Sequence, residues 1–237
     1  MKLRSILPFA FGALFALPPV VAGDLPVTAE EQAKLTPGAV LAELMAGNKR
    51  YVAGELSDPN VKARVKASAS GQYPKAVILS CLDSRVPVEL VFDRGIGDVF
   101  SVRVAGNVLN ADVLGSMEYG CKVAGAKLVF VLGHTGCGAV KGACDGIDLG
   151  HLGGLLGKIR PAVESVKEPS DPAQRTSDNE AFVNEVAAEN VLRVMRQIRT
   201  RSVVLAAMLE EGSIGLVGAI YDVASGQLAF LEESLPD

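Results

Sequence analysis

The sequences KAVILSCLDSR, at residues 75–85, and KLVFVLGHTGCG, at residues 127–138, decide the fold of this chain. Each begins with a short apolar run and ends in a polar turn, a pattern typical of buried strands in a parallel sheet. Chemistry in such sheets gathers at the carboxyl ends of the strands, where both turns would lie. We therefore expect one edge of the sheet to bring together Cys81, Asp83, Arg85, His134 and Cys137.

Strand-like and helix-like segments alternate along the rest of the chain. Further strand patterns occur at residues 98–104, 214–221 and 227–232, and helical patterns occur at 110–125, from 138, at 151–166, at 179–200 and at 201–211. The stretch from Pro37 to Gly54 predicts an amphipathic N-terminal helical arm. This order predicts an α/β fold, with a mainly parallel central sheet of about four to five strands flanked by helices.

The composition indicates one globular domain. The chain has 237 residues, of which 49% are hydrophobic, so it contains enough apolar side chains for a sizeable core. Its net charge of −4 gives no electrostatic support for binding nucleic acid.

The first 22 residues have the pattern of a secretory signal peptide. Lys2 and Arg4 precede an apolar run at residues 6–17, and Ala22 ends a small-residue cleavage site. The run is shorter than the ~20 residues that a membrane span needs. We expect residues 1–22 to be removed on export, residues 23–36 to form a flexible N-terminus and residues 37–237 to form one domain. The mature protein is predicted to be periplasmic and free of the membrane.

Cys81, His134 and Cys137 form a ligand set suited to zinc. Two thiolates and an imidazole are typical zinc ligands, and a catalytic zinc with three protein ligands keeps its fourth position for water. The glycines at positions 133, 136 and 138 would let the second turn fold tightly enough for both of its ligands to face one point. This combination points to a zinc hydrolase or hydratase.

The fourth position of the metal distinguishes a catalytic site from a structural one. His151 and Asp83 are the two candidates for a fourth protein ligand. Arg85 competes for Asp83, because arginine and a carboxylate can form a strong bidentate pair. If Asp83 pairs with Arg85, the fourth position stays open for water; if Asp83 binds the metal, the site is closed.

Two further cysteines, Cys121 and Cys144, lie outside this set. We expect them to be buried free thiols, since free cysteine is among the most buried residue types. A bridge between them stays open as an alternative, because the sequence does not set their separation.

The Cys-x-Asp-Ser-Arg and His-x-x-Cys pair, in this order and spacing, resembles the signature of the β-class carbonic anhydrases. Further matches are Gly47-Asn48-x-Arg50, RVAGN at 103–107, GHTGCGAV at 133–140 and VGAIYD at 217–222, so that the resemblance spans about residues 35–233. It implies a zinc lyase that reversibly hydrates carbon dioxide to bicarbonate and a proton, by attack of zinc-bound hydroxide on CO2. It also implies one Zn²⁺ per chain, and homodimers or higher homo-oligomers.

The resemblance assigns roles to the residues of both turns. Cys81, His134 and Cys137 match the zinc ligands of the family, and Asp83 with Arg85 matches its catalytic dyad. In a closed state of the enzyme, Asp83 would become a conditional fourth zinc ligand.

The resemblance also implies a substrate pocket. Gln72 matches the glutamine that binds substrate across the dimer interface in plant-type members, and Phe100 and Tyr119 match aromatic positions lining that pocket. Members regulated by bicarbonate carry a tryptophan where this chain has Ile78, and the chain contains no Trp. The sequence is therefore similar to the plant-like subtype, in an exported bacterial form.

Two other functions remain open from the sequence. The same scaffold would suit a hydrolase of carbon disulfide or carbonyl sulfide, because these substrates are linear like CO2. A non-catalytic exported zinc-binding protein would need Asp83 or His151 fixed on the metal, with no exchangeable water.

Overall fold

A five-stranded sheet forms the centre of the protein in the computed structural model, which describes residues 25–236. The strand order is β2-β1-β3-β4-β5, and all neighbours are parallel except β4 and β5, which pair antiparallel. The strands are β1 (Ala76–Ser80), β2 (Val99–Arg103), β3 (Leu128–His134), β4 (Gly215–Tyr221) and β5 (Leu228–Ser234). The predicted α/β fold with a mainly parallel sheet is confirmed.

The burial of the strands explains their near-continuous apolar sequences. Every residue of β1, β3 and β4 is buried, as expected for parallel strands that helices cover on both faces. The edge strand β2 is only partly buried. Ser80 at the end of β1 pairs with Leu132 of β3, so Cys81 and His134 leave the sheet at the same edge.

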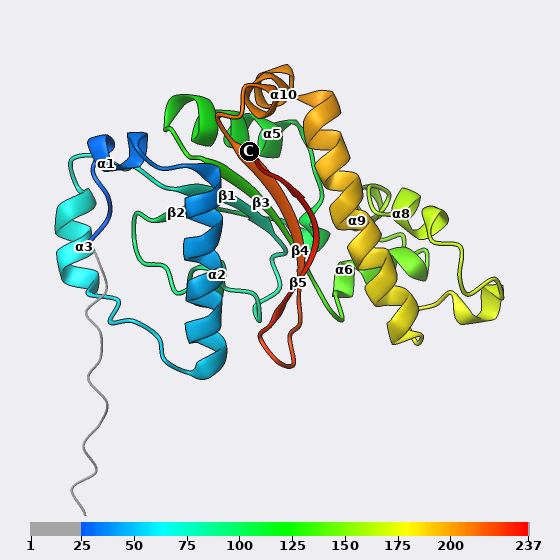
Figure 1. Ribbon diagram of the computed structural model, residues 1–237. Helices are drawn as coiled ribbons and strands as arrows, with labels where there is room; N and C mark the ends of the chain where they lie inside the picture. The colour runs from blue at the N-terminus through cyan, green and yellow to red at the C-terminus, as the bar shows by residue number, and fades with distance from the viewer. Residues whose placement is uncertain (1–24, 237) are drawn as a thin grey trace, which may run out of the picture.

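Helices cover both faces of this sheet (Figure 1). The N-terminal helices are α1 (Ala29–Ala33), α2 (Pro37–Ala53), α3 (Val61–Ser68) and α4 (Val88–Val91). The remaining helices are α5 (Ala111–Glu118), α6 (Gly138–Cys144), α7 (His151–Leu156), α8 (Arg160–Ser165), α9 (Glu180–Arg201) and α10 (Val203–Glu210).

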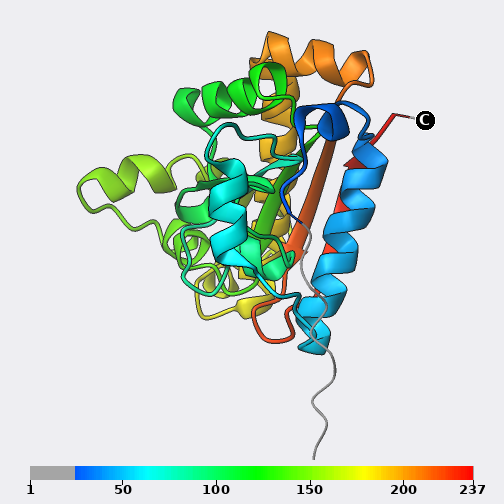
Figure 2. The ribbon, with the colours of Figure 1, turned by 90° about the vertical axis from the view of Figure 1, so that its left-hand side faces the viewer.

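The core is divided by the sheet into two apolar layers. On one face, Ile78 and Phe130 pack with buried residues of α2 and α4. On the other face, Leu79 and Val131 pack with buried residues of α5, α6, α8, α9 and α10. Figure 2 shows α2 on one side of the sheet and α5 on the opposite side. The long helix α9 contacts both β3 and β4, and its N-terminal half lies next to the carboxyl edge of the sheet.

Within the N-terminal segment 23–36, for which the sequence predicts flexibility, residues 29–33 form helix α1. Thr28 and Glu31 form a capping box at the start of this helix, a sequence pattern that indicates a helix N-terminus. Gln32 is buried, and its side-chain amide donates hydrogen bonds to the carbonyl oxygens of Pro74 and Ala124. Helix α1 is therefore attached to the rest of the domain.

Other expectations are met in part. The stretch predicted as one helix at 151–166 consists of two short helices, α7 and α8, and the helix predicted at 110–125 continues beyond α5 as a π-helical turn over Tyr119–Val123. The predicted signal peptide, residues 1–22, lies outside the described residues. Within residues 25–236, none of the helices combines the length and hydropathy needed to cross a bilayer.

Candidate metal centre

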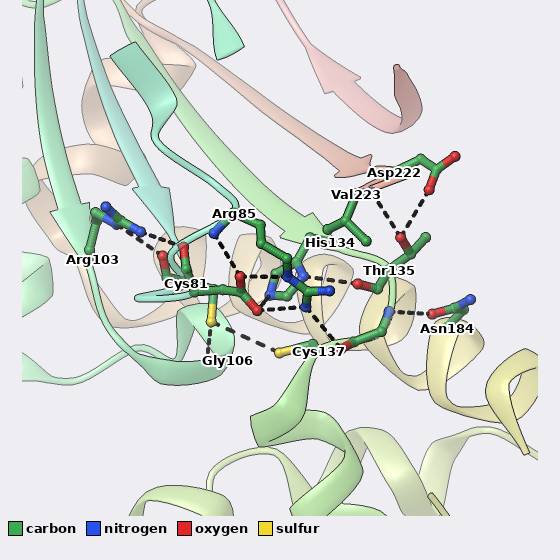
Figure 3. Close-up of polar contacts among 12 residues, drawn as sticks. Cys81, Arg85, Arg103, Gly106, His134, Thr135, Cys137, Asn184, Asp222 and Val223 are labelled. Atoms are coloured by element: carbon green, nitrogen blue, oxygen red, sulfur yellow. Dashed lines mark hydrogen bonds and ion pairs between the residues drawn. The ribbon is translucent and has the colours of Figure 1, made fainter. Parts of the chain in front are cut away.

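Three predicted ligands lie together at the carboxyl edge of the sheet (Figure 3). Cys81 directly follows β1, His134 is the last residue of β3, and Cys137 is the N-cap of α6. All three side chains are buried, and their ligand atoms lie within 4.8 Å of one another. The two Sγ atoms are 3.9 Å apart.

The turn between His134 and Cys137 is bound on two sides. The Thr135 hydroxyl donates a hydrogen bond to Oδ1 of Asp222 at 3.1 Å and accepts one from the N–H of Val223, both just after β4. Gly136 has a φ of 62°, a conformation that glycine adopts without strain, and its N–H donates to Oδ1 of Asn184 at 2.9 Å. The turn is therefore fixed to the end of β4 and to α9.

His134 is oriented to bind a cation through Nε2. Its Nδ1 lies 3.0 Å from the carbonyl oxygen of Thr135, so Nδ1 carries the proton in that hydrogen bond and Nε2 keeps its lone pair. Among the described residues, Nε2 has no hydrogen-bond partner although it is buried. A buried polar atom without a partner is costly, and a metal ion among these three ligands would satisfy it.

The two cysteines compete for one negative charge when no cation is present. The hydrogen bond from the Cys137 thiol lowers the pKa of Cys81 to about 4. The same contact, together with burial, raises the pKa of Cys137 well above its ordinary value. A divalent cation would remove this competition, because coordination favours the thiolate form of both side chains.

Asp83 pairs with Arg85 beside the cluster. Oδ1 of Asp83 accepts hydrogen bonds from the backbone N–H and Nε of Arg85, both at 2.9 Å, and Oδ2 accepts one from Nη2 at 2.8 Å. These contacts hold the pKa of Asp83 below its usual range. Oδ2 lies 3.8 Å from Nε2 of His134, next to the three ligand atoms but outside their cluster. Of the two arrangements considered from the sequence, the structure contains the Asp83–Arg85 pair.

Arg103, at the end of β2, supports the loop that carries Cys81 and Asp83. Its Nε donates to the carbonyl oxygen of Cys81 at 3.1 Å, and its Nη2 donates to that of Asp83 at 2.6 Å. Arg103 belongs to the RVAGN match at residues 103–107, but the sequence assigns it no role. Both acceptors are backbone carbonyl oxygens. Because every residue has one, the sequence does not indicate which of them Arg103 binds.

The predicted pocket residues do not belong to the three-residue cluster. The rings of Phe100 and Tyr119 are in contact, with centroids 6.2 Å apart, and line a cavity of about 640 Å³ beside the edge strand β2. Gln72 is exposed and precedes β1, whereas Cys81 follows it. His151 is exposed at the start of α7 and does not belong to the three-residue cluster.

Cys121 and Cys144 are free thiols in the structure. Cys121 is buried as predicted, and burial raises its pKa to about 12. Cys144 is only partly buried, and its pKa is raised to about 11 mainly by the same effect. Both side chains therefore stay protonated at neutral pH.

Gly106 approaches the cluster through its backbone. It has a φ of 63°, its N–H donates to Sγ of Cys81 at 3.3 Å, and an added Cβ would lie 2.5 Å from Cδ1 of Ile159. We expect Gly106→Ala to lower the free energy of unfolding by about 1–3 kcal/mol, because it combines backbone strain with this clash. Denaturant unfolding would measure the change.

Gly115 is the matched control for this substitution. It lies within helix α5, and an added Cβ would meet no atom within 4 Å. Gly115→Ala should therefore raise the free energy of unfolding by up to about 1 kcal/mol, the difference in helix propensity. Equal stabilities of the two variants would contradict the requirement for glycine at position 106.

Comparison with known proteins agrees with this geometry. Residues 76–228, which contain the whole cluster, match the family described as carbonic anhydrase. The Mycobacterium tuberculosis protein named Carbonic anhydrase 2 is 40% identical over 192 residues, which cover 81% of this chain and 91% of that protein.

Solved structures show the same fold. The β-carbonic anhydrase CafA of the fungal pathogen Aspergillus fumigatus is 28% identical, with a TM-score of 0.61, and the match covers 81% of this chain and 90% of that chain. A tetrameric β-carbonic anhydrase from Sordaria macrospora is 20% identical, with a TM-score of 0.60, and covers 72% of this chain and 90% of its own. Taken together with the buried Cys-His-Cys cluster, these matches show that the chain belongs to the β-class carbonic anhydrase family.

Proposed function

We propose that this protein is a zinc-dependent carbonic anhydrase that reversibly hydrates CO2 to bicarbonate and a proton. The observation that carries the proposal is a buried three-ligand cluster beside an Asp83–Arg85 pair that leaves Asp83 out of the ligand set. Three protein ligands with an open fourth position are typical of catalytic zinc, whereas structural zinc has four protein ligands.

Zinc fits the donors that the structure provides. Cys81, His134 and Cys137 would hold it through two sulfur atoms and the unpartnered Nε2, and these borderline-soft donors favour zinc over magnesium or calcium. When bound, zinc supplies Lewis-acid activation of a water molecule.

The surrounding residues would orient the reactants. Asp83 is ionised at neutral pH, and Arg85 lowers its pKa further, so its carboxylate would accept a hydrogen bond from the attacking water. Arg85 holds both carboxylate oxygens of Asp83, which fixes the direction of that bond. Arg103 holds the loop backbone on which Asp83 lies. This arrangement contributes positioning rather than a new covalent step.

Gln72 would reach a metal centre only in a second copy of the chain. Within one chain it lies before β1 and Cys81 lies after it, and five strand residues span about 16 Å. The edge strand β2 is incompletely buried, and Phe100 and Tyr119 line a cavity beside it. We infer a homodimer in which each chain supplies Gln72 and this aromatic wall to a shared pocket.

Mixing two impaired variants tests this sharing of sites. Gln72→Ala keeps the metal ligands, and Cys137→Ser keeps Gln72. A mixed dimer would contain one complete site, so reassembling equal amounts should restore about a quarter of the wild-type activity per chain. Stopped-flow assays before and after reassembly would measure it. Activity equal to the sum of the separate variants would show that Gln72 does not act across an interface.

Membership of the plant-like subtype predicts how bicarbonate inhibits the enzyme. Because Ile78 is part of the buried core and the chain has no tryptophan, we expect bicarbonate to inhibit hydration without cooperativity. A titration with bicarbonate at fixed pH and ionic strength should give a hyperbolic curve. A sigmoidal loss of activity would instead assign the protein to the regulated subtype.

Stopped-flow CO2 hydration by the zinc-loaded protein tests the proposed function directly. Fast hydration supports it. Zinc binding without CO2 hydration, together with turnover of carbon disulfide or carbonyl sulfide, would assign the protein to the sulfur-substrate hydrolases. Zinc binding without any turnover would leave a zinc-binding protein.

We also propose that the protein is exported to the periplasm. The support is the charge and hydropathy pattern of residues 1–22, which lie outside the described residues. Mass spectrometry of the protein recovered from a periplasmic extract would locate its N-terminus. An intact N-terminus in the cytoplasmic fraction would refute export.

A further inference from the structure

Helix α9 is connected to the loop of Cys81 through a buried asparagine. Asn190 is 2% exposed, and its Nδ2 donates a hydrogen bond to the carbonyl oxygen of Gly106 at 2.9 Å. The N–H of Gly106 in turn donates to Sγ of Cys81 at 3.3 Å. Asn190 therefore fixes the residue whose backbone contacts a predicted metal ligand.

The same helix is connected to the loop of Cys137 through a second asparagine. Oδ1 of Asn184, which is labelled in Figure 3, accepts a hydrogen bond from the N–H of Gly136 at 2.9 Å. Gly136 directly precedes Cys137. The carbonyl oxygen of Gly136 faces Nη2 of Arg85 at 3.5 Å. The peptide units around Gly136 are thus held between α9 and the dyad.

Neither asparagine is favoured by the helix itself. Asparagine has a lower helix propensity than leucine or alanine, and burying an amide is unfavourable unless it is hydrogen-bonded. The neighbours of Asn190 on this face one turn away, Val186 and Val194, are apolar and buried, so an apolar residue would suit the core at this position. We therefore attribute the presence of asparagine at both positions to the hydrogen bonds that the two amides form with the loops of the metal site.

We propose that Asn184 and Asn190 are positioning residues of the metal centre, through which α9 holds both cysteine sulfurs in place for the metal. This inference rests on the proposed zinc site. The N–H of Gly106 also draws electron density from the Cys81 sulfur, so Asn190 tunes the donor strength of that thiolate. Loss of either asparagine should weaken metal binding, because contacts behind the ligands orient them.

Metal affinity measured by competition with a chromophoric chelator tests the proposal. We expect Asn190→Leu and Asn184→Ala each to weaken zinc binding about 10–100-fold. In the Co²⁺-substituted protein, Asn190→Leu should also shift the sulfur-to-cobalt charge-transfer band to longer wavelength, because the thiolate becomes more electron-rich. A purely structural role would leave this band unchanged.

Ile198→Ala provides the matched control. Ile198 is fully buried on the same helix, about 12 Å along its axis from Asn190, so its truncation destabilises α9 at a distance from the loops. Zinc affinities of both asparagine variants equal to that of Ile198→Ala would overturn the proposal. If Asn190→Leu does not fold, the partly exposed Asn184 decides the question in the same assay.

The experiment also separates this inference from the function on which it rests. A wild-type protein that does not bind zinc would refute the proposed function. A wild-type protein that binds zinc tightly, with asparagine variants that bind it equally well, would refute only the role of α9.

Discussion

Replacing Cys137 by serine is expected to abolish zinc binding and to reduce CO2 hydration about a thousand-fold or more. The substitution would remove one of three proposed ligands, and the neutral hydroxyl is a poor donor where zinc favours a thiolate. Without the metal, the Lewis-acid contribution to water activation is lost. Metal analysis of the purified variant and stopped-flow hydration would measure both effects.

Cys121→Ser is the matched control for this experiment. Cys121 is also buried, and burial raises its pKa to about 12, so it is a protonated core thiol outside the cluster. Its substitution is expected to lower stability while leaving the zinc content and turnover of the folded protein unchanged. Zinc retained by Cys137→Ser at the wild-type level would show that Cys137 is not a ligand.

Replacing Arg85 by alanine is expected to lower kcat about 100–1,000-fold with zinc retained. The Arg85 side chain donates two hydrogen bonds to the Asp83 carboxylate, through Nε and Nη2. Without them, only the backbone N–H of residue 85 holds Oδ1, and Asp83 loses its fixed orientation. Because Oδ2 of Asp83 already lies 3.8 Å from Nε2 of His134, the released carboxylate would compete with water for the metal. Hydration rates and zinc content should be measured on the same samples.

The Arg50–Asp93 ion pair is a control for the Asp83–Arg85 pair, because it also joins an arginine to an aspartate. Arg50 donates to Asp93 in a partly buried pair that involves none of the three ligands. Arg50→Ala should lower stability without a comparable loss of kcat. If Arg85→Ala lost zinc together with activity, Arg85 would instead be a residue that maintains the fold of the site.

The ligand cluster could be predicted from the sequence because its residues lie in two short turns, each at the end of a strand. Cys81 and the turn from His134 to Cys137 each follow an apolar strand, and parallel strands place such turns at one edge of the sheet. The Asp83–Arg85 pair was foreseen as one of two arrangements, since both residues lie within the same turn. Which arrangement forms depends on side-chain geometry that spacing alone does not determine.

The residues that support the cluster were not predicted, because they act from distant parts of the chain. Asn190 reaches Gly106 across 84 positions, and Asn184 reaches Gly136 across 48. The sequence of a helix does not indicate which distant residue an asparagine side chain will bind, because the fold alone brings the two together. Helix α1 was missed for a different reason, since its capping box lies in a segment that was predicted to be a flexible N-terminus.

A metal bound at the cluster would also affect how the protein unfolds. Cys81 and Cys137 are 56 positions apart, so a metal held by both closes a long loop of the chain, as a covalent cross-link would. Because an unfolded chain lacks this preformed arrangement, binding energy adds to the free energy of folding. If zinc binds here, the thermal midpoint of the protein should rise with the concentration of free zinc, and metal supply would then help to determine its lifetime.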